Sequence, residues 1–282
     1  CTVATQSREM KMMIMDYMEQ TGSDMSLVDF KMHDLGFRGV SSVETAGIGG
    51  CAHLISFKGT DNIAGIVVAK DYYNCPVAGF SIPFSDHSTM TSWGRDKERD
   101  AYANMLDQYP TGLIAVVTDS YNCHHANNEI WGNQLKDRVI NRNGPVMIRP
   151  DSGEPHLAVI NTLNELGKGF GYVTNSKGFK SLNPRVRVIQ GDGITLKEIK
   201  LIYETLWNNK WSGDTISFGS GGALLQKLDR DTLKFAFKCS SVTVNGKQKH
   251  VSKTPYENSW KTSKQGRLKL VYTDRFKTVQ ET

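Results

Sequence analysis

The chain has 282 residues, 39% of them hydrophobic and 22% charged, and 34 Lys and Arg against 29 Asp and Glu give a formal net charge of +5. These fractions are typical of a globular protein and exclude a disordered, collagenous or disulfide-scaffold chain. The length allows one large domain or two ordinary ones, and no apolar run approaches the roughly 20 residues of a membrane-spanning helix.

The first half of the chain predicts alternating helices and strands. Residues 6–20 have apolar side chains at helical spacing, and Ser26–Met32 is expected to be a strand. Ser41 and Glu44 form the capping-box pattern that begins a helix. Further elements are expected as a strand at Val77–Pro83, a helix at about 95–109, a buried strand at Leu113–Thr118 and a helix at 121–139.

The alternation continues as far as about residue 220. The expected elements are a strand at Val146–Arg149, a helix from Pro155 to near Gly167, a strand at Val186–Gln190, a helix capped by Thr195 and Glu198, and a strand at Thr215–Phe218. Alternating β and α elements favour parallel strands joined by right-handed crossovers, and a closed (β/α) barrel fits this order. After residue 230, period-2 patterning and the turn NGKQ indicate antiparallel β structure instead.

Cysteine usage and short motifs exclude several classes of site. The five cysteines include no C-x-x-C pair, which argues against zinc ribbons and redox motifs and favours a reducing, cytoplasmic compartment. Cys123-His124-His125 has no second ligand pair at metal-binding spacing. The dinucleotide-like GIGGCA at 47–52 falls inside an expected helix rather than at a strand-to-helix turn.

Seven loops that follow expected strands are rich in polar residues and glycine. In (β/α) barrels the active site lies at the carboxyl ends of the strands. The loops are HDLGFRG (33–39), FKGTD (57–61), SDHST (85–89), TDSY (118–121), RPDSGEP (149–155), QGDGI (190–194) and FGSGG (218–222). Packing alone does not require such a series, so the loops predict a ligand site.

The residue types in these loops suit a phosphorylated sugar. Glycine clusters let backbone N–H groups approach phosphate oxygens, and Arg38, Arg149 and Arg230 can add charge-assisted bonds. Asp151 and Asp192 suit ribose hydroxyls or Mg²⁺.

His87 lies between Asp86 and Ser88 in the SDHST loop. A loop histidine beside a carboxylate can act as an acid, a base or a nucleophile. A hydrogen-bonded structural histidine is the equally open alternative for this residue considered alone.

The stretch from Lys247 to Lys269 holds most of the local positive charge. A solvated face, a rim for a phosphorylated ligand and a nucleic-acid patch are all compatible with it. Its basic residues are Lys247, Lys249, Lys253, Lys261, Lys264, Arg267 and Lys269.

Long ordered motifs carry a resemblance to a known family. HDLGFRGVSSVETAGIGG, NCPVAGFSIPFSDHSTMTSWG, IRPDSGEP, VIQGDG and FGSGGALLQKLDRD resemble the nicotinamide phosphoribosyltransferases, which are type II phosphoribosyltransferases, from about Thr2 to past Arg267. The resemblance implies an irregular α/β barrel with a β-rich second domain. It implies that nicotinamide and PRPP (phosphoribosyl pyrophosphate) react, with Mg²⁺, to nicotinamide mononucleotide and pyrophosphate. It also implies a homodimer with the active site at the interface, and no nucleic-acid or membrane partner.

The same resemblance predicts the domain organisation. Residues 1–22 would be a helical remnant of the second domain, 23–228 the catalytic barrel, 229–266 a β-rich part of the second domain, and 267–282 a return to the barrel. The chain begins with Cys1 rather than Met, and we expect the family's N-terminal region, and some of its C-terminal end, to be missing from it.

Site roles follow by motif. Asp61 would accept a hydrogen bond from the nicotinamide amide, and His87 would be phosphorylated by ATP, an activating co-substrate. Asp119 and Asp151 would support His87, Mg²⁺ or the ribose. The resemblance places pyrophosphate or phosphate at Arg38 and Arg149, ribose at Gly191 and Asp192, the 5′-phosphate at Gly221, Gly222 and Arg230, and further nucleotide phosphates at Lys253, Lys261 and Arg267, across the dimer.

Two positions depart from the family pattern. Leu35 stands where the family usually has a Phe that stacks on the nicotinamide ring, a contact worth about 0.5–1.5 kcal/mol, and Phe37 is the candidate to compensate. Asp86 stands where Glu is common. Three alternatives remain open: nicotinate phosphoribosyltransferase, a non-catalytic fragment or binding protein, and nucleic-acid binding through residues 247–269.

Overall fold

The computed structural model describes residues 1–227, 233, 238–252 and 263–281. Contacts divide the chain into two compact units, Cys1–Asp229 and Arg230–Thr282. Arg230, Lys253 and Lys261, which carry predicted phosphate contacts, lie outside the described residues. Among the helices that are described, none combines the length and apolar character needed to cross a bilayer.

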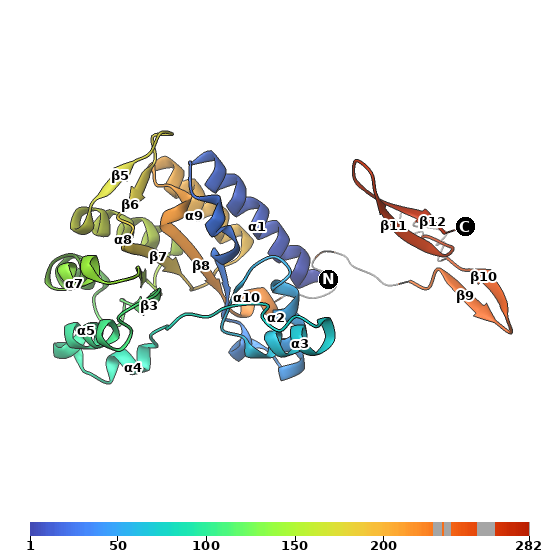
Figure 1. Cartoon of the computed structure of the whole chain (residues 1–282), viewed down its shortest axis with the longest axis horizontal. Coiled ribbons are helices and arrows are strands. Elements are labelled where there is room, and N and C mark those ends of the chain that lie inside the picture. The colour runs from blue at the N-terminus through green and yellow to red at the C-terminus, as the bar shows by residue number, and fades with distance from the viewer. Residues whose placement is uncertain (228–232, 234–237, 253–262, 282) are drawn as a thin grey trace. The chain divides into compact units, whose positions relative to one another are not determined.

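A six-stranded sheet forms the centre of the first unit (Figure 1). Its strand order is β2-β1-β8-β7-β4-β3, and every neighbouring pair is parallel. This confirms the parallel arrangement predicted from the alternation of strands and helices. The strands are β1 (Met32–Asp34), β2 (Gly59–Thr60), β3 (Ile114–Val117), β4 (Val146–Arg149), β7 (Val186–Gln190) and β8 (Ile216–Ser220).

The segment 80–85 joins the two edges of this sheet. Phe80 bridges Gly59 on β2, and Phe84 bridges Ala115 on β3. Backbone hydrogen bonds of 2.9 Å run from Thr60 N–H to the Phe80 carbonyl and from Ala115 N–H to the Pro83 carbonyl. The curled sheet is therefore closed into an irregular (β/α) barrel, as predicted. The prediction of a regular strand at Val77–Pro83 is wrong. Pro83 has no N–H to donate, and the segment makes only isolated bridges.

Helices cover the outside of the barrel. Helix α1 lies beside α9 in Figure 1 and packs on both α2 and α9, while α8 packs on α9 and β7. The α-helices are α1 (Thr2–Gln20), α2 (Val43–His53), α3 (Ile63–Tyr73), α4 (His87–Thr91), α5 (Glu98–Gln108), α6 (Cys123–His125), α7 (Lys136–Asn141), α8 (Pro155–Phe170), α9 (Leu196–Asn208) and α10 (Gly222–Leu225). In the part of the chain that the structure describes, the short 3-10 helices are η1 (Met25–Phe30), η2 (Phe37–Gly39), η3 (Arg95–Lys97) and η5 (Gly213–Thr215), and η4 (Ala126–Gln134) is a π-helix.

Three local predictions are corrected. The strand expected at Ser26–Met32 is instead the 3-10 helix η1, because the Asp24 side chain accepts the Ser26 N–H at 2.9 Å and starts a tight turn. Helix α2 is capped by Ser42, whose hydroxyl accepts the Thr45 N–H at 3.0 Å, and not by Ser41. The single helix expected at 121–139 is divided into α6, η4 and α7.

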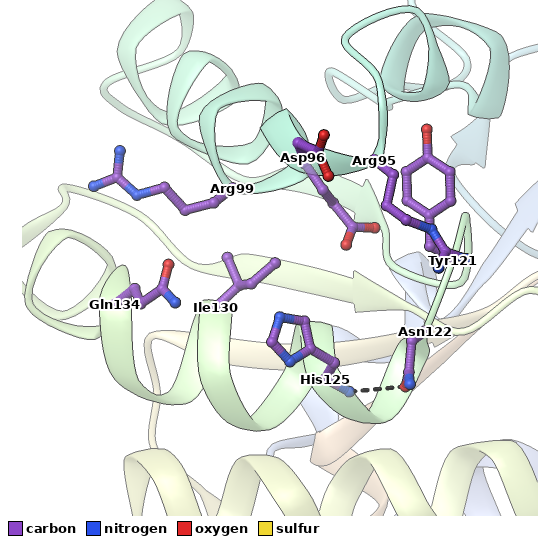
Figure 2. Close-up of a pocket in the computed structure, with 9 residues that line it drawn as sticks. Arg95, Asp96, Arg99, Tyr121, Asn122, His125, Ile130 and Gln134 are labelled. Carbon is purple, nitrogen blue, oxygen red and sulfur yellow. Dashed lines mark hydrogen bonds between the residues drawn. The ribbon is translucent and has the colours of Figure 1, made fainter.

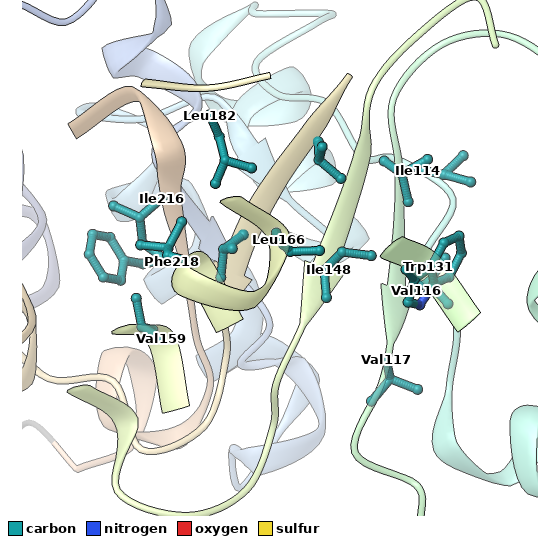
Figure 3. Packing of buried hydrophobic residues seen from close by; sticks show 14 of the residues in the cluster. Ile114, Val116, Val117, Trp131, Ile148, Val159, Leu166, Leu182, Ile216 and Phe218 are labelled. Carbon is teal, nitrogen blue, oxygen red and sulfur yellow. The ribbon is translucent and has the colours of Figure 1, made fainter. Parts of the chain in front are cut away.

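Both faces of the sheet are buried, which explains why its strands are apolar runs. On the outer face, Ile148, Val116 and Phe218 pack beneath the covering helices (Figure 3). Trp131 stacks on Tyr102 with ring centroids 4.9 Å apart. On the inner face, a second cluster fills part of the barrel and consists of Ala115, Met147 and Ile189 with Ile82, Phe84 and Leu113.

The remaining strands form small hairpins. In the first unit, β5 (Tyr172–Thr174) pairs with β6 (Lys180–Leu182), a hairpin that the sequence patterns did not predict. The described part of the second unit contains β9 (Ser241–Val244) with β10 (Lys247–His250), and β11 (Leu268–Tyr272) with β12 (Phe276–Gln280). Asn245 and Gly246, with φ of 50° and 74°, form the predicted NGKQ turn. The four-part domain division stays a prediction.

Candidate active site

His87 begins α4, directly after the segment that closes the barrel. Asp86 caps this helix by accepting the Ser88 N–H at 2.8 Å. The His87 ring lies between two carboxylates: Nε2 is 3.0 Å from Asp119 Oδ1, and Nδ1 is 4.0 Å from Asp151 Oδ2. The structure thus brings together the three residues predicted as catalytic, each from a different loop.

Arg149 forms one wall of this cluster. Its Nη2 donates to Asp151 Oδ2 at 3.2 Å, and its guanidinium lies over the Phe84 ring, 4.8 Å from the centroid. Burial lowers the pKa of Arg149, and the neighbouring carboxylates, Asp151 first, partly offset the effect. Arg38 adds a second positive charge nearby, which also lowers the pKa of Arg149. The positive charges of the two arginines predicted to bind pyrophosphate therefore act on the same part of the site.

Asp151 is held in a mixed electrostatic environment. Burial raises the pKa of its carboxyl, the positive charge of Arg149 lowers it, and the negative charge of Asp119 raises it again. When a carboxyl with a raised pKa lies beside a second carboxylate, an added cation stabilises the ionised form of both groups. The pair is therefore suited to a Mg²⁺ ion brought by a phosphorylated substrate.

Asp61 follows β2 and meets side chains from two other segments. Ser81, in the closing segment, donates its hydroxyl to Asp61 Oδ1, and His33 Nε2 of β1 lies 3.4 Å from the same oxygen. Burial raises the pKa of Asp61, but hydrogen bonds from His33 and Ser81 and the positive charge of Arg149 outweigh it, so the net pKa is lowered. Asp61 is an anion at neutral pH.

Leu35 and Gly191 border the same space. A methyl group placed on Gly191 would lie 3.3 Å from Asp151 Oδ1 and 3.7 Å from Leu35 Cδ1. The QGDG loop that contains Gly191 and Asp192 is held by Gln190, whose Oε1 accepts both of their N–H groups, at 2.7 and 3.1 Å. Phe37, the predicted aromatic replacement, is exposed on η2, and the aromatic ring beside Arg149 is that of Phe84.

The glycine loop after β8 approaches the HDLGFRG loop. A methyl group on Gly39 would lie 3.3 Å from the Gly222 Cα, and one on Gly221 would lie 3.6 Å from the Leu35 carbonyl oxygen. The two loops therefore meet at the carboxyl end of β1 and β8. Arg267 lies in the second unit, where it pairs with Glu281 at 3.5 Å.

Four residues at this site had no predicted role: His33, Ser81, Phe84 and Gln190. His33 and Gln190 lie inside the motifs HDLGFRG and QGDG, but from the sequence each is expected only to end a strand. Ser81 and Phe84 lie in an apolar run, and only the bridges of the closing segment bring them to the site.

No group of three His, Cys, Asp or Glu side chains suited to a metal ion occurs among the residues placed in the structure, at the His87 cluster or elsewhere. Asp119 and Asp151 offer two carboxylates, and phosphate oxygens and water would have to complete the shell of a Mg²⁺ ion. His124, which adjoins Cys123, instead bonds to Glu165.

A separate surface pocket of about 490 Å³ lies between η3 and η4 (Figure 2). Arg95 lies over the Tyr121 ring, 5.2 Å from its centroid, and the His125 N–H donates to Asn122 at 3.0 Å. Its lining residues include none of those predicted for the site, so this pocket is distinct from the His87 cluster.

Comparisons with known proteins identify relatives of this chain. The sequence profile of the nicotinate phosphoribosyltransferase (NAPRTase) family matches residues 30–281. The chain is 48% identical over 273 residues to a nicotinamide phosphoribosyltransferase of Xanthomonas campestris pv. campestris, covering 96% of this chain and 58% of the relative. It is 32% identical to one of Mycoplasma pneumoniae, covering 95% and 60%.

Among solved structures, nicotinate-nucleotide pyrophosphorylase from Pyrococcus furiosus aligns with a TM-score of 0.47 and 14% identity, over 78% of this chain and 47% of that one. The chain spans about three fifths of the length of the two curated relatives. The family profile, in contrast, covers nearly all of the chain. This chain therefore belongs to the nicotinate phosphoribosyltransferase (NAPRTase) family.

Proposed function

We propose that the chain carries the phosphoribosyl-transfer site of a nicotinamide phosphoribosyltransferase, which converts nicotinamide and PRPP to nicotinamide mononucleotide and pyrophosphate for NAD salvage. The observation that carries this proposal is the convergence of Asp61, His87, Asp119, Arg149 and Asp151 at the carboxyl ends of the barrel strands. The names of the two curated relatives favour nicotinamide over nicotinate.

Asp61 supports the choice of nicotinamide. Its lowered pKa keeps it anionic at neutral pH. An anion accepts a hydrogen bond from an amide N–H₂ group and repels the carboxylate of nicotinate. Asp61 is then the side chain that distinguishes the amide from the carboxylate.

The reaction needs little proton transfer. The pyridine nitrogen forms a bond to C1 of the ribose while the bond from C1 to the pyrophosphate oxygen breaks, and the charge of the leaving group grows. Arg149 and Arg38 are the cations that would neutralise this charge, and the glycine loops after β7 and β8 would hold the ribose and the 5′-phosphate. Catalysis then consists mainly of placing two reactants and stabilising pyrophosphate.

Magnesium fits this site in the form of a substrate complex. Mg²⁺ commonly takes one or two carboxylates and completes its shell with phosphate oxygens and water. Asp119 and Asp151, which flank His87, are the residues that would hold it. When bound, the ion would neutralise pyrophosphate charge.

ATP is proposed as an activating co-substrate through His87. The γ-phosphoryl group would move to a ring nitrogen as its bond to the ADP oxygen breaks. His87 is accessible enough for this, since 41% of its side chain is exposed, while Asp119, its hydrogen-bond partner, is only 7% exposed. The buried carboxylate would stabilise the ring in one orientation.

The proposal also includes a cytoplasmic location and assembly into a homodimer. Helices α2 and α3 expose a contiguous apolar face with a groove of about 1000 Å³. Exposed fractions there reach 76% at Ile55 and 80% at Tyr72. Exposed apolar surface of this extent marks an interaction site, and a second copy of the chain is the proposed partner. Light scattering should give twice the chain mass; a monomer would contradict the dimer, and Tyr72→Lys should dissociate it.

Product analysis tests the proposed function. The chain, supplied with nicotinamide, PRPP and Mg²⁺, should form nicotinamide mononucleotide, and nicotinate should react poorly. Asp61→Ser should reduce the preference for nicotinamide. Absence of product together with absence of PRPP–Mg²⁺ binding by calorimetry would favour a non-catalytic fragment.

A further inference from the structure

We propose that His33 is a positioning and specificity-determining residue that holds the Asp61 carboxylate by one oxygen and leaves the other to accept the substrate amide. This inference rests on the proposed function, since it concerns the same substrate. It assigns a role to a histidine that lies in the HDLGFRG motif but had no predicted role.

Two side chains approach Asp61 at the same atom. Ser81 donates its hydroxyl to Oδ1, and His33 Nε2 lies 3.4 Å from that oxygen. Among the described residues, Asp61 Oδ2 has no hydrogen-bond partner. A carboxylate held at one oxygen cannot rotate freely, so the second oxygen keeps a fixed direction for an incoming N–H group.

The His33 ring is buried with its reactive edge at the site. Its side chain is 9% exposed, and among the described residues Nε2 has no hydrogen-bond partner; its approach to Asp61, at 3.4 Å, is an ion-pair distance. A buried polar atom without a partner costs about 1–3 kcal/mol. This cost would be removed if a substrate edge bonded to Nε2. It would also be removed if the 3.4 Å contact with Asp61 shortened slightly to a hydrogen bond.

Gly59 provides the room that the ring needs. A methyl group placed on Gly59 would lie 2.5 Å from His33 Nδ1 and 3.0 Å from the Met32 carbonyl oxygen. Its φ is not in the left-handed region, so space rather than backbone conformation requires glycine here. The glycine of the FKGTD motif is thus explained by the histidine of the neighbouring strand.

The backbone sets the three side chains rigidly. β1 and β2 pair in parallel with His33 beside Gly59, and the Asp61 N–H donates to the Asp34 carbonyl at 3.0 Å. The bridge between Phe80 and Gly59 brings the closing segment, and Ser81 with it, to the same point. Strand register, not loop sequence, therefore places His33 at Asp61.

Steady-state kinetics of the whole chain test the proposal. His33→Ala should raise the KM for nicotinamide about tenfold or more, while the kcat and the KM for PRPP change less than about threefold. His33→Gln, whose amide nitrogen can replace Nε2 as a donor, should restore most of the loss. His125→Ala, an exposed histidine, is the matched control and should leave all three values unchanged.

A general packing defect would behave differently. It would change kcat and both KM values together, and glutamine would not rescue it. An unchanged nicotinamide KM in a folded His33→Ala chain would overturn the proposal. Gly59→Ala, which crowds the ring without removing a polar group, should reproduce the KM effect.

A second measurement does not depend on turnover. Carboxyl ¹³C NMR of the chain should show the Asp61 pKa rising in His33→Ala and returning towards the wild-type value in His33→Gln. An Asp61 titration that does not respond to His33 would sink the inference. If the wild-type chain forms no nicotinamide mononucleotide, the proposed function fails, but this titration still decides whether His33 holds Asp61.

Discussion

The imidazole of His87 and the carboxylate of Asp119 are joined by a hydrogen bond of 3.0 Å between Nε2 and Oδ1. A carboxylate acceptor at Nε2 favours the ring form that carries its proton there. The lone pair is then on Nδ1, which is 4.0 Å from Asp151 Oδ2. The geometry therefore points to Nδ1 as the nitrogen that would receive a phosphoryl group.

Asp119→Asn tests this assignment. Because an amide stabilises the imidazolium less than a carboxylate and can favour the other ring form, phosphorylation of His87 by ATP should slow by about ten- to a hundredfold. ³¹P NMR of the wild-type phosphoprotein should show the Nδ1 isomer. Asp96→Asn, an exposed aspartate, should have no effect. Phosphorylation at Nε2 would contradict the assignment.

Arg149→Lys should weaken PRPP binding although it keeps the charge. The planar guanidinium bonds to Asp151 and lies over the Phe84 ring, and an ammonium group reproduces neither geometry. We expect the KM for PRPP to rise about tenfold or more, measured by initial rates. Arg99→Lys, on the exposed face of α5, is the matched control. A PRPP KM within twofold of wild type would show that the guanidinium does not contact the substrate.

Leu35→Phe should strengthen nicotinamide binding. A stacked ring adds about 0.5–1.5 kcal/mol over an aliphatic contact, so the KM for nicotinamide should fall about two- to tenfold. Room is limited, however, because a methyl group on Gly219 would lie only 2.6 Å from Leu35 Cδ1. Gly219→Ala should therefore have the opposite effect by displacing Leu35. A higher KM in Leu35→Phe would show that the site has no room for the larger ring at this position.

Much of the barrel could be predicted from local sequence. β4 and β7 were predicted with the bounds they have, because strands buried on both faces are short runs in which apolar residues predominate. The strand expected at Ser26–Met32 failed because a side-chain bond from Asp24 competes with extended backbone. A hydrophobicity pattern does not predict side-chain hydrogen bonds of this kind.

The candidate site, like the barrel, could be predicted only in part. Loop composition placed His87, Asp119, Arg149 and Asp151 at one end of the barrel, and the structure brings them within contact. The partnership of His33 with Asp61 could not be predicted, since it depends on the register of β1 and β2. The two residues meet only when β1 and β2 pair in this register.

Lys31 gives a prediction about stability rather than activity. It is 3% exposed inside the barrel, and its Nζ donates to the backbone carbonyls of Asp214 and Ile216 at 3.1 and 2.8 Å. Burial lowers the pKa of Lys31 to about 7; the charge of Asp214 opposes this and that of Arg187 adds to it. The folded chain therefore holds this lysine neutral at alkaline pH.

In the unfolded chain the lysine stays protonated up to its ordinary pKa of 10.5. Between pH 7 and 10.5 the unfolded state binds more protons, so Lys31 makes the free energy of unfolding rise with pH across this window, by an amount on the order of a few kcal/mol. Below pH 7 both states are protonated and the contribution is constant.

Lys31→Met should remove this rise. Urea unfolding at pH 7, 8 and 9 should give a flatter pH dependence for Lys31→Met than for the wild type. Lys200→Met, on the exposed face of α9, should keep the wild-type slope, and the contributions of other titrating groups cancel in the comparison. Equal slopes in Lys31→Met and Lys200→Met would mean that Lys31 is protonated in the folded barrel at pH 9.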